Sequence, residues 1–294
     1  MSQPITSLSS ARENVNALNP LIGLLSGKRL AVLTGAGMST ESGIPDYRGP
    51  ETQRRARKPI RFQEYAASAE GRARYWARSM LGWPRFSRAE PHAGHAALVQ
   101  LERHSHVLGI ITQNVDGLHQ AAGNRRVIEL HGALSEVRCL RCDEPESRGA
   151  LQARLEALNP HLAHVSHEQA ALAPDGDADL SSHWLADFRV ASCLSCDGVL
   201  KPNVVFFGES VPRDRVHAAA SLVDEAEALL VLGSSLAVYS GYRFVKRAHE
   251  LGRPIGLVTL GETRADALAH VRVEAKLKLV LPELAHALMG ESPP

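Results

Sequence analysis

The sequence contains four cysteines, which form two C-x-x-C pairs, Cys139 with Cys142 and Cys193 with Cys196. Thiolate pairs at this spacing suit the tetrahedral coordination of Zn²⁺ better than they suit disulfides. Four thiolates would fill every coordination position of the ion, so no position is left for a reactive water. The cysteines therefore predict one structural Zn²⁺ ion and a reducing compartment.

A second group of residues that could carry chemistry begins at a glycine turn, Gly35-Ala36-Gly37, after an apolar run at residues 29–34. Small residues after a strand let backbone N–H groups approach a pyrophosphate. The turn lacks the complete G-x-G-x-x-G, and basic residues stand at 55–58, where a dehydrogenase would have a ribose-binding acid. Alone, the turn fits a phosphate loop or a tight structural turn, and it disfavours a hydride-transfer enzyme.

Polar loops also follow the other apolar runs. The glycine turn continues into a polar loop at 38–49, Gln113, Asn114 and Asp116 follow a second run, and small polar residues at 233–235 follow a third. Loops after parallel strands are where α/β folds bind ligands. Two amides and a carboxylate suit a ligand with an amide and several hydroxyls, although one of them could merely cap a helix. The loop at 233–235 is a further candidate contact for a phosphate or a ribose.

His131 is the candidate base of this group. It follows a short apolar run at 127–130 and precedes Gly132. An imidazole can accept a proton near neutral pH. Any one of the 14 histidines is more often structural or exposed than catalytic. The place of His131 at a strand end, close after the amide loop, distinguishes it from the others.

Strands that alternate with helices must position these residues. The predicted strands are residues 29–34, 106–112, 127–130, 203–207, 228–232 and 254–260. The predicted helices are residues 92–103, 213–227 and 241–251. This alternation predicts an α/β fold, in which helices cover both faces of a parallel sheet.

Two segments interrupt the alternation. Residues 59–86 are rich in arginine, alanine and aromatic residues and predict a helical insertion. Residues 133–200 carry both cysteine pairs and predict a small zinc-binding module. We therefore expect an N-terminal extension at 1–27, a large domain at 28–132 and 201–294 that includes the insertion, and the zinc module between its two parts.

Composition and charge exclude several classes of function. The net charge is +1 over 294 residues, so no overall field attracts nucleic acid or an acidic membrane. A basic run at 54–58 is typical of a solvated loop. The sequence shows neither an apolar run that could span a bilayer nor a secretory signal. We expect a cytoplasmic protein, or a mitochondrial matrix protein in a eukaryote, that binds no nucleic acid directly and no membrane. Its oligomeric state is open, and a monomer is compatible with the sequence.

The motifs together resemble the sirtuin family. The family's order is matched from about Lys28 onward by GAGMSTESGIPDYRG, TQNVDGLH, ELHG, the paired C-x-x-C sites, LKPNVVFFGE and LGSSL. Class II of the family, the branch that contains a mitochondrial sirtuin, is resembled by residues 75–78, 82–84, 173–177 and 238–244. The resemblance implies a Rossmann-like domain, a zinc module with a class II insert, and NAD⁺-dependent removal of acyl groups from lysine.

The resemblance also implies roles for the polar loops. NAD⁺ would lie between the large domain and the zinc module. Its contacts would be Gly35, Ala36, Gly37, Ser39, Thr40, Ile44, Pro45, Asp46, Tyr47, Arg48, Gln113, Asn114, Asp116, Gly233, Ser234, Ser235, Thr259, Leu260, Gly261 and Leu277. The family usually has Asn where Thr259 stands, so this sequence lacks an amide on the adenosine side.

In the reaction that the resemblance implies, the nicotinamide–ribose bond breaks and the acyl oxygen of the modified lysine attacks the ribose. His131 then acts as a base on a ribose hydroxyl, and the products are free lysine, nicotinamide and O-acyl-ADP-ribose. A loop at 38–50 would keep out water, which would hydrolyse the activated ribose. Two other functions stay open: ADP-ribose transfer to a protein, and a non-catalytic sensor of NAD⁺ or ADP-ribose, which would not need His131.

The expected partner is an acyl-lysine protein. Residues 204–209 would pair with its backbone as an added strand, which reads main chain more than sequence. The contacting side chains would be Val205, Phe207, Gly208, Glu209, Tyr75 and Arg78. Tyr75 and Arg78 have the spacing with which one sirtuin class reads acidic acyl chains, so Arg78 could favour a carboxylate-bearing acyl group. Alternatively, Arg78 lies on a helix surface beside core aromatics.

Overall fold

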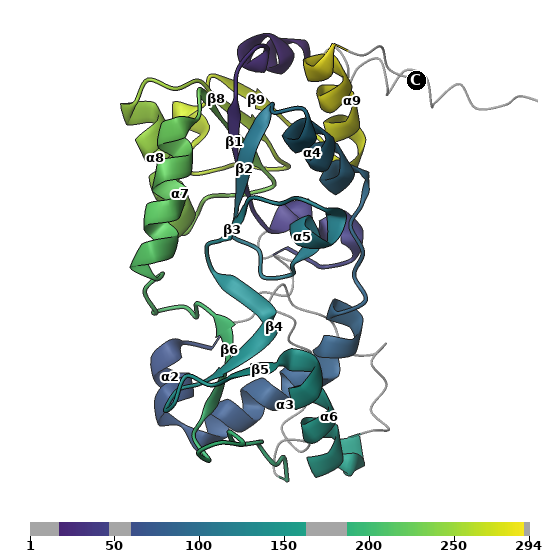
Figure 1. Cartoon of the computed structure of the whole chain (residues 1–294), viewed down its shortest axis with the longest axis vertical. Helices are drawn as coiled ribbons and strands as arrows, with labels where there is room; N and C mark the ends of the chain where they lie inside the picture. The colour runs from purple at the N-terminus through teal and green to yellow at the C-terminus, as the bar shows by residue number, and fades with distance from the viewer. Residues whose placement is uncertain (1–17, 47–59, 163–186, 291–294) are drawn as a thin grey trace, which may run out of the picture.

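The structure, a computed structural model, describes residues 18–46, 60–162 and 187–290. These residues form two units that are stacked along the long axis of the molecule (Figure 1). The larger unit is built on a six-stranded sheet and the smaller one on a three-stranded sheet. The chain passes between the two units more than once, so neither unit is a continuous segment of the sequence.

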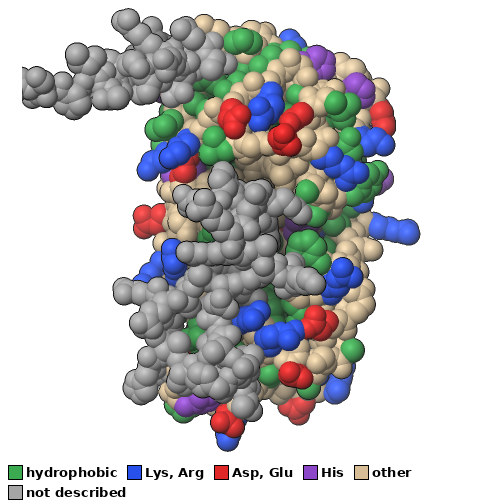
Figure 2. Space-filling model, turned by 180° about the vertical axis from the view of Figure 1, so that it is seen from behind, with side chains coloured by type: hydrophobic (Ala, Val, Ile, Leu, Met, Phe, Trp, Pro, Cys, Tyr) green, Lys and Arg blue, Asp and Glu red, His purple; other side chains and the backbone are tan. Residues whose placement is uncertain are grey.

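Some of the predicted features lie outside the described residues. They are Tyr47 and Arg48, the basic run at 54–58 and the class II turn at 173–177. On the face seen from behind, described side chains of both charges are mixed (Figure 2). No described helix combines the length and the apolarity that a membrane span requires.

The larger unit is a Rossmann-like parallel sheet, which confirms the predicted fold class. Its strand order is β3-β2-β1-β7-β8-β9, and all neighbouring strands are parallel. The strands are β1 (Leu30–Thr34), β2 (Val107–Thr112), β3 (Val127–Glu129), β7 (Ala228–Leu232), β8 (Ile255–Val258) and β9 (Val271–Val273). The sequence did not reveal β9, because three residues are too few to show a pattern. The order reverses between β1 and β7, and a ligand crevice can open there.

Helices cover both faces of this sheet, as predicted. They are α4 (Ala93–Arg103), α7 (Arg213–Glu225), α8 (Tyr239–Glu250) and α9 (Leu277–Met289). α4 and α9 pack on one face, and α7 and α8 pack on the other. Because side chains alternate along a strand, β1 places Leu30 and Val32 on the first face and Ala31 and Leu33 on the second. Burial on both faces explains why the strands are continuous apolar runs.

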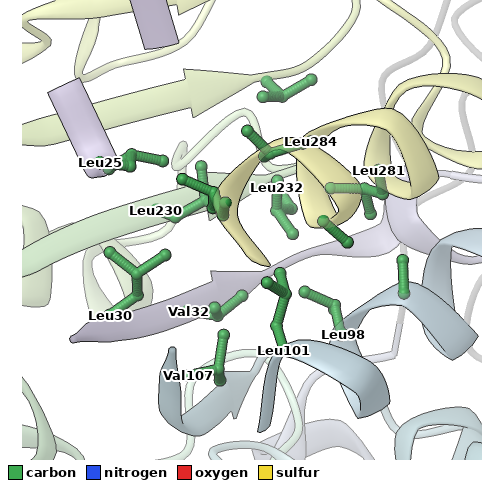
Figure 3. Close-up of a cluster of buried hydrophobic side chains, with 14 of the residues drawn as sticks. Leu25, Leu30, Val32, Leu98, Leu101, Val107, Leu230, Leu232, Leu281 and Leu284 are labelled. Carbon is green, nitrogen blue, oxygen red and sulfur yellow. The ribbon is translucent and has the colours of Figure 1, made fainter. Parts of the chain in front are cut away.

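The residues just before β1 belong to the core of the larger unit. Residues 18–25 are helical, and Leu18, Leu21 and Leu25 are buried. Their spacing of three and four residues places them on one face of the helix. Figure 3 shows Leu25 in the apolar cluster that β1, β7, α4 and α9 form. These residues, which fall within the predicted N-terminal extension at 1–27, therefore pack against the sheet and stabilise it.

The smaller unit contains an antiparallel sheet in the order β5-β4-β6. Its elements are β4 (Gly132–Cys139), β5 (Pro145–Ser147), α6 (Arg148–Leu158) and β6 (Leu200–Val204). The helical insertion forms α2 (Phe62–Ala67) and α3 (Ala69–Phe86). Tyr65 of α2 and Trp76 of α3 share a buried cluster with Val137 of β4. The insertion therefore packs with the smaller unit, which differs from its expected place in the large domain.

The predicted strand at 203–207 is displaced in the structure. The observed strand, β6, ends at Val204 and pairs with β4 in the smaller sheet rather than with the parallel sheet. The Glu209 carboxylate accepts the N–H of Phe206 at 2.9 Å, and the N–H of Glu209 donates to the Phe206 carbonyl at 3.0 Å. This turn, with Gly208 at φ +84°, ends the strand inside the apolar run. The apolar pattern could not show this, because Glu209 lies beyond the run.

Three buried histidines make a prediction about acid stability. The rings of His92 and His95 meet edge to face with centroids 4.4 Å apart, and those of His95 and His119 are tilted with centroids 5.1 Å apart. Burial lowers the pKa of all three, that of His95 to about 2 and that of His119 to about 4. Below pH 6.5 the unfolded chain therefore binds more protons than the folded one. The free energy of unfolding consequently decreases as the pH is lowered. Between pH 7.5 and 5.5 we expect a loss of about 1.4 kcal/mol for each of His95 and His119.

Urea denaturation at the two pH values measures this loss. His95→Gln removes one titrating group and should reduce the pH dependence of the free energy of unfolding. His249→Gln, at an exposed position on α8, should leave it unchanged. The prediction is wrong if His95→Gln and the wild-type protein show the same pH dependence.

Candidate active site

A cavity of about 1940 Å³ lies at the carboxyl ends of β1, β2 and β7. These strands end level, with Thr34 of β1 opposite Thr112 of β2 and Leu232 of β7. The loops that follow them meet where the strand order of the sheet reverses, which is where α/β folds bind ligands. Leu134 of β4 and Phe206, which follows β6, belong to the wall formed by the smaller unit. The cavity therefore lies between the two units.

The structure brings most of the predicted site residues to this cavity. Its wall includes Gly35, Ala36, Gly37, Ser39, Thr40, Ile44, Pro45, Asp46, Tyr75, Gln113, Asn114, Asp116, His131, Val205, Phe207, Gly208, Glu209, Gly233, Ser234, Ser235, Thr259, Leu260, Gly261 and Leu277. Among the described residues predicted for ligand contacts, Arg78 alone does not line it. Segments distant in the sequence therefore share one cavity, and their individual contacts with a ligand remain predictions.

The glycine turn after β1 packs closely against the loop after β7. A Cβ on Gly35 would lie 2.7 Å from the Cβ of Ser234, and a Cβ on Gly37 would lie 2.9 Å from the Cα of Gly233. The N–H groups of Gly35 and Gly37 donate to the carbonyls of Leu232 and Gly233, at 3.0 and 2.8 Å. The glycines are therefore needed for contact between the loops. Both N–H groups thus have partners within the protein, and the approach of this turn to a phosphate stays a prediction.

The two amides and the carboxylate after β2 connect the loops around the cavity. Gln113 donates to a serine hydroxyl of the loop after β7 at 2.8 Å, and Asn114 donates to the Ser39 hydroxyl at 2.9 Å. Ser39 donates to Asp116 at 2.6 Å, and Asp116 also accepts the first N–H of α5 (Leu118–Ala122) at 2.9 Å. Burial raises the pKa of Asp116, while these two hydrogen bonds lower it. One role of Asp116 is thus to accept the first N–H of α5, and the residue also lines the cavity.

His131 has hydrogen bonds at both ring nitrogens. Nδ1 lies 2.9 Å from the Gln113 carbonyl oxygen, and Nε2 lies 2.8 Å from the Ser240 hydroxyl. A carbonyl oxygen can only accept, so Nδ1 carries the proton and the lone pair of the neutral ring is on Nε2. Burial lowers the pKa of His131, the bond with Gln113 raises it, and the Arg215 guanidinium lowers it. The imidazole is therefore neutral at pH 7 and can accept a proton.

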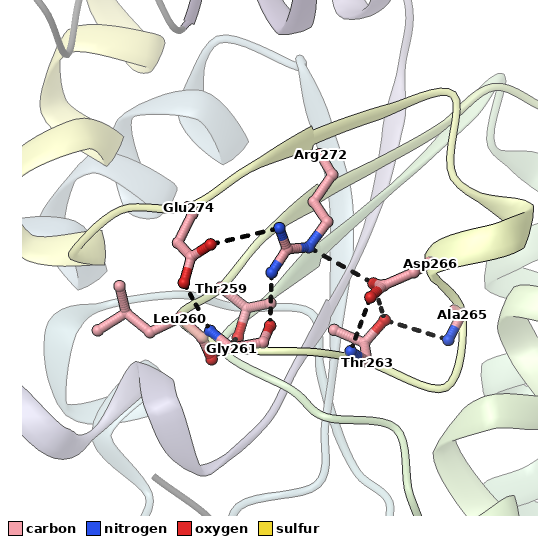
Figure 4. Close-up of polar contacts among 8 residues, drawn as sticks. All are labelled: Thr259, Leu260, Gly261, Thr263, Ala265, Asp266, Arg272 and Glu274. Carbon is pink, nitrogen blue, oxygen red and sulfur yellow. Dashed lines mark hydrogen bonds and ion pairs between the residues drawn. The ribbon is translucent and has the colours of Figure 1, made fainter. Parts of the chain in front are cut away.

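The loop after β8 lines another part of the cavity and is held by side chains from β9 and the residue after it (Figure 4). Arg272 donates to the Gly261 carbonyl at 2.7 Å and forms ion pairs with Asp266 and Glu274. Glu274 accepts the N–H of Gly261 at 3.1 Å. Gly261 has φ +79°, a conformation that favours glycine. Arg272 and Glu274 thus fix the backbone beside Thr259.

The residues after β6 form the wall next to His131. The N–H of Val205 donates to the His131 carbonyl at 2.8 Å. Glu209 forms an ion pair at 3.0 Å with Lys201, whose side chain is 8% exposed. Phe207 is 41% exposed although it is large and apolar. An exposed aromatic ring in the same cavity wall as a neutral histidine suits contact with another molecule.

The four cysteines meet at the end of β4, in the geometry of a zinc site. Their sulfur atoms all lie within 4.8 Å of one another. Cys142 Sγ lies 3.7 Å from Cys193 and 3.4 Å from Cys196, and Cys139 lies 3.5 Å from Cys196. Thiolates placed at ~2.3 Å around Zn²⁺ would be about 3.8 Å apart, which is close to these values. A backbone N–H, that of Arg141, also donates to Cys139 at 3.3 Å. The four residues fit a structural Zn²⁺ ion.

The sequence does not single out Ser240, which lies in the cavity wall, or Lys201, the ion-pair partner of Glu209. Ser240 falls only within the segment at 238–244, and Lys201 only within the motif LKPNVVFFGE. Ser240 and His131 are 109 residues apart, so no spacing rule connects them. The one local signal for Ser240 is its position shortly after the polar loop at 233–235, which follows the apolar run at 228–232.

Sequence comparisons identify related proteins over most of the chain. The model of the Sir2 family matches residues 35–240. A protein of Bordetella bronchiseptica described as an NAD-dependent protein deacetylase is 51% identical over 268 residues, which cover 91% of this chain and 97% of that protein. The NAD-dependent protein deacylase Sirt4 of Drosophila melanogaster is 47% identical over 264 residues, which cover 89% of this chain and 84% of that protein.

Solved structures resemble the fold over a similar length. One described as showing the structural basis for the mechanism and regulation of Sir2 enzymes has a TM-score of 0.74 and 28% identity, and the match covers 94% of this chain and 98% of that chain. Another, described as Sir2 with a p53 peptide and NAD⁺, has a TM-score of 0.69 and 31% identity, and the match covers 93% of this chain and 97% of that chain. The similarity therefore includes both units.

Proposed function

The chain belongs to the Sir2 family, and on that basis we propose that it is an NAD-dependent protein deacylase acting on acyl-lysine side chains. The observation that carries the proposal is the neutral His131 in a cavity that it shares with Gln113, Asn114 and Asp116. Relatives described as NAD-dependent protein deacetylases are 51% and 49% identical over 268 residues each. A protein that only sensed NAD⁺ would not need a base at this position.

NAD⁺ supplies the ribose that receives the acyl group once its bond to nicotinamide breaks. We assign its phosphate and adenosine side to the loops at 233–235 and 259–261, and its nicotinamide ribose to the side of Asn114 and Asp116. The residues at 39–41 and 43–46 line the cavity, and Ser39 is hydrogen-bonded to Asp116. This part of the wall would exclude water from the reacting ribose.

His131 would accept the proton of a ribose hydroxyl at Nε2 while the acyl group is transferred. The Gln113 carbonyl supports this role because it keeps the proton of the neutral ring on Nδ1. The Val205 N–H holds the backbone of His131 beside the wall where Phe207 is exposed. We place the acyl-lysine at this wall, and the expected products are free lysine, nicotinamide and O-acyl-ADP-ribose.

Arg272 provides a test of the adenosine side. We expect Arg272→Met to raise KM for NAD⁺ about tenfold, because a charged hydrogen bond to the Gly261 carbonyl is lost and the loop loses its fixed backbone. The kcat should change less than about twofold, since Arg272 does not line the cavity near His131. Initial rates at varied NAD⁺ and saturating acetyl-lysine peptide measure both constants.

Arg103→Met, at an exposed position at the end of α4, is the matched control and should keep the wild-type KM. An unchanged KM for NAD⁺ in Arg272→Met would contradict the assignment of the loop at 259–261. A lower kcat at unchanged KM would contradict it as well.

We propose that the acyl-lysine substrates carry uncharged acyl groups. We also propose that the chain belongs to class II of the family. Class II is supported by the sequence at 238–244 and by the 47% identity with Drosophila Sirt4. Arg78 does not line the cavity, whereas Tyr75 does. Tyr75 is buried against Tyr65 and Phe206, and a phenol offers no full positive charge to a carboxylate. Tyr75 therefore does not supply the positive charge that an ion pair with an acidic acyl chain requires.

The decisive experiment is mass spectrometry of the zinc-loaded protein with NAD⁺ and acetyl-, succinyl-, glutaryl- and lipoyl-lysine peptides. We expect deacylated peptide, nicotinamide and O-acyl-ADP-ribose, with acetyl or lipoyl favoured over the acidic groups, and no turnover by His131→Ala. Labelled NAD⁺ in the same reactions detects ADP-ribose transfer to protein, the alternative activity. No NAD⁺ binding and no nicotinamide release with any peptide would refute the proposal.

We further propose that the protein acts in the cytoplasm as a monomer. The support is the predicted reducing environment of its four cysteines and a candidate site whose described wall is formed by one chain. Sedimentation equilibrium of the zinc-loaded protein tests the oligomeric state, and a dimer mass would contradict the second part.

A further inference from the structure

Ser240 and His131 form a hydrogen-bonded pair that the proposed deacylation does not require. Ser240 Oγ lies 2.8 Å from Nε2 of His131, and both residues line the cavity. Nδ1 of the same ring donates to the Gln113 carbonyl at 2.9 Å. A serine hydroxyl bonded to a base, which is itself oriented by a third group, is the arrangement that activates serine as a nucleophile.

The backbone at Ser240 can stabilise the negative charge that a nucleophilic attack creates. Ser240 is the second residue of α8, and no side-chain hydrogen bond caps the N-terminus of this helix. The first N–H groups of a helix have no partner within the helix and carry partial positive charge. The N–H that follows a nucleophilic serine is a common donor to the oxyanion, and here it belongs to Gly241.

Glycine at position 241 allows the helix to approach the histidine loop. A Cβ on Gly241 would clash with the side-chain amide of Gln113, so a larger residue would displace that amide from its present position. Gln113 is also the residue whose carbonyl orients His131. The close contact therefore places the hydroxyl of Ser240 and the lone pair of His131 within hydrogen-bond distance.

The electrostatic environment favours the basic form of the imidazole. Burial lowers the pKa of His131, and the Arg215 guanidinium also disfavours a second positive charge, although the bond with Gln113 acts in the opposite direction. A neutral ring at pH 7 can take the proton of Ser240 as the oxygen attacks. The exposed Phe207 and the partly buried Val205 in the same cavity wall offer apolar surface for a short acyl chain.

We propose that Ser240 and His131 hydrolyse short-chain carboxylic esters without NAD⁺, an activity separate from lysine deacylation. The oxygen of Ser240 attacks the ester carbonyl carbon, and its proton passes to Nε2 of His131. The bond from the carbonyl carbon to the ester oxygen breaks, and the alcohol leaves with that proton. Water then attacks the acyl-serine and gives a proton to His131. The carboxylic acid leaves, and the proton returns to Ser240.

Hydrolysis of p-nitrophenyl acetate by the zinc-loaded full chain, without NAD⁺, tests the proposal. We expect a burst of p-nitrophenol as the acyl-enzyme forms, and acetylated Ser240 in peptides from the quenched reaction. Ser240→Ala should lose the burst, and His131→Ala should slow it about 100-fold. Ser221→Ala removes an exposed serine of the same cavity wall, on α7, and should keep the wild-type burst.

Ser240→Cys keeps a nucleophile at the same place and should restore the burst, which a merely structural role of Ser240 would not explain. Circular dichroism of each variant shows whether it is folded. The proposal is overturned if the wild-type protein shows no burst, or if acetylation occurs at another residue and persists in Ser240→Ala. NAD⁺-dependent deacylation of an acetyl-lysine peptide is measured in parallel, so the failure of one activity is distinguishable from the failure of the other.

Discussion

His131→Asn should lower kcat for NAD⁺-dependent deacylation by about 10²–10⁴-fold, the usual contribution of a general base. The imidazole is neutral, and its Nε2 lone pair accepts a hydrogen bond from Ser240, which lines the same cavity. An asparagine side chain has an amide N–H that can still bond with the Gln113 carbonyl, but it offers no group that accepts a proton at neutral pH. KM for NAD⁺ should change little, because the loops assigned to its phosphates and adenosine lie elsewhere in the wall. Mass spectrometry of deacylated peptide measures the rate.

His217→Asn is the matched control, since His217 is exposed and lines the same cavity from α7. It should retain the wild-type kcat. A His131→Asn protein that binds NAD⁺ and stays within tenfold of the wild-type rate would remove the central support for the proposed mechanism.

The pH profile gives an independent check on the same residue. Because burial lowers the pKa of His131, the wild-type kcat/KM should fall on acidification with a midpoint below pH 6.5. His131→Asn should lose this acidic limb. A wild-type midpoint above pH 6.5 would contradict the assignment of the base.

Removal of the metal should have the second large effect, loss of the smaller unit's fold and of at least about nine-tenths of the activity. Zinc binding in small zinc modules contributes about 10–16 kcal/mol to folding, which exceeds the total stability of many domains. Without it, Cys139, Cys142, Cys193 and Cys196 lose the ion that would hold their sulfur atoms together, within 4.8 Å of one another. β4 ends at Cys139 and also carries Leu134 in the cavity wall, so the site would lose part of its boundary.

Hydrogen exchange before and after chelation measures this effect. Exchange should rise sharply in β4, α6 and β6 and much less in β1 and β7, whose core is formed with other helices. Cys142→Ser should behave like the chelated protein. Leu194→Ser is the control, since Leu194 lies inside the second C-x-x-C pair and is 78% exposed. Metal-free protein with unchanged folding and activity would disprove the structural role of zinc.

Much of the larger unit could be predicted from local patterns. Apolar runs of four to six residues marked β1, β2, β7 and β8, because a strand buried on both faces has no polar side. The run at 203–207 failed as a predictor, since the turn closed by Glu209 depends on a side chain outside the run. The helical residues 18–25 were overlooked although Leu18, Leu21 and Leu25 show a helical spacing.

The candidate site was predictable where a motif lies directly after a strand. His131 and the amide loop follow β3 and β2, and parallel strands place their carboxyl ends at one edge of the sheet. The use of each group was not predictable. The N–H groups of Gly35 and Gly37 bond to the neighbouring loop, and Arg78 lies off the cavity. Whether a backbone N–H or a side chain can reach a ligand depends on how the surrounding chain packs against it and on which hydrogen-bond partners that chain supplies.

The sequence by itself determined the class of fold, the expected zinc ligands and the expected base, because each is a local pattern of residue types and spacing. Only the tertiary structure decided that α2 and α3 pack with the smaller unit and that Ser240 contacts His131. Both are contacts between segments far apart in the chain. Their geometry follows from the packing of whole helices and sheets, which no short window of residues encodes.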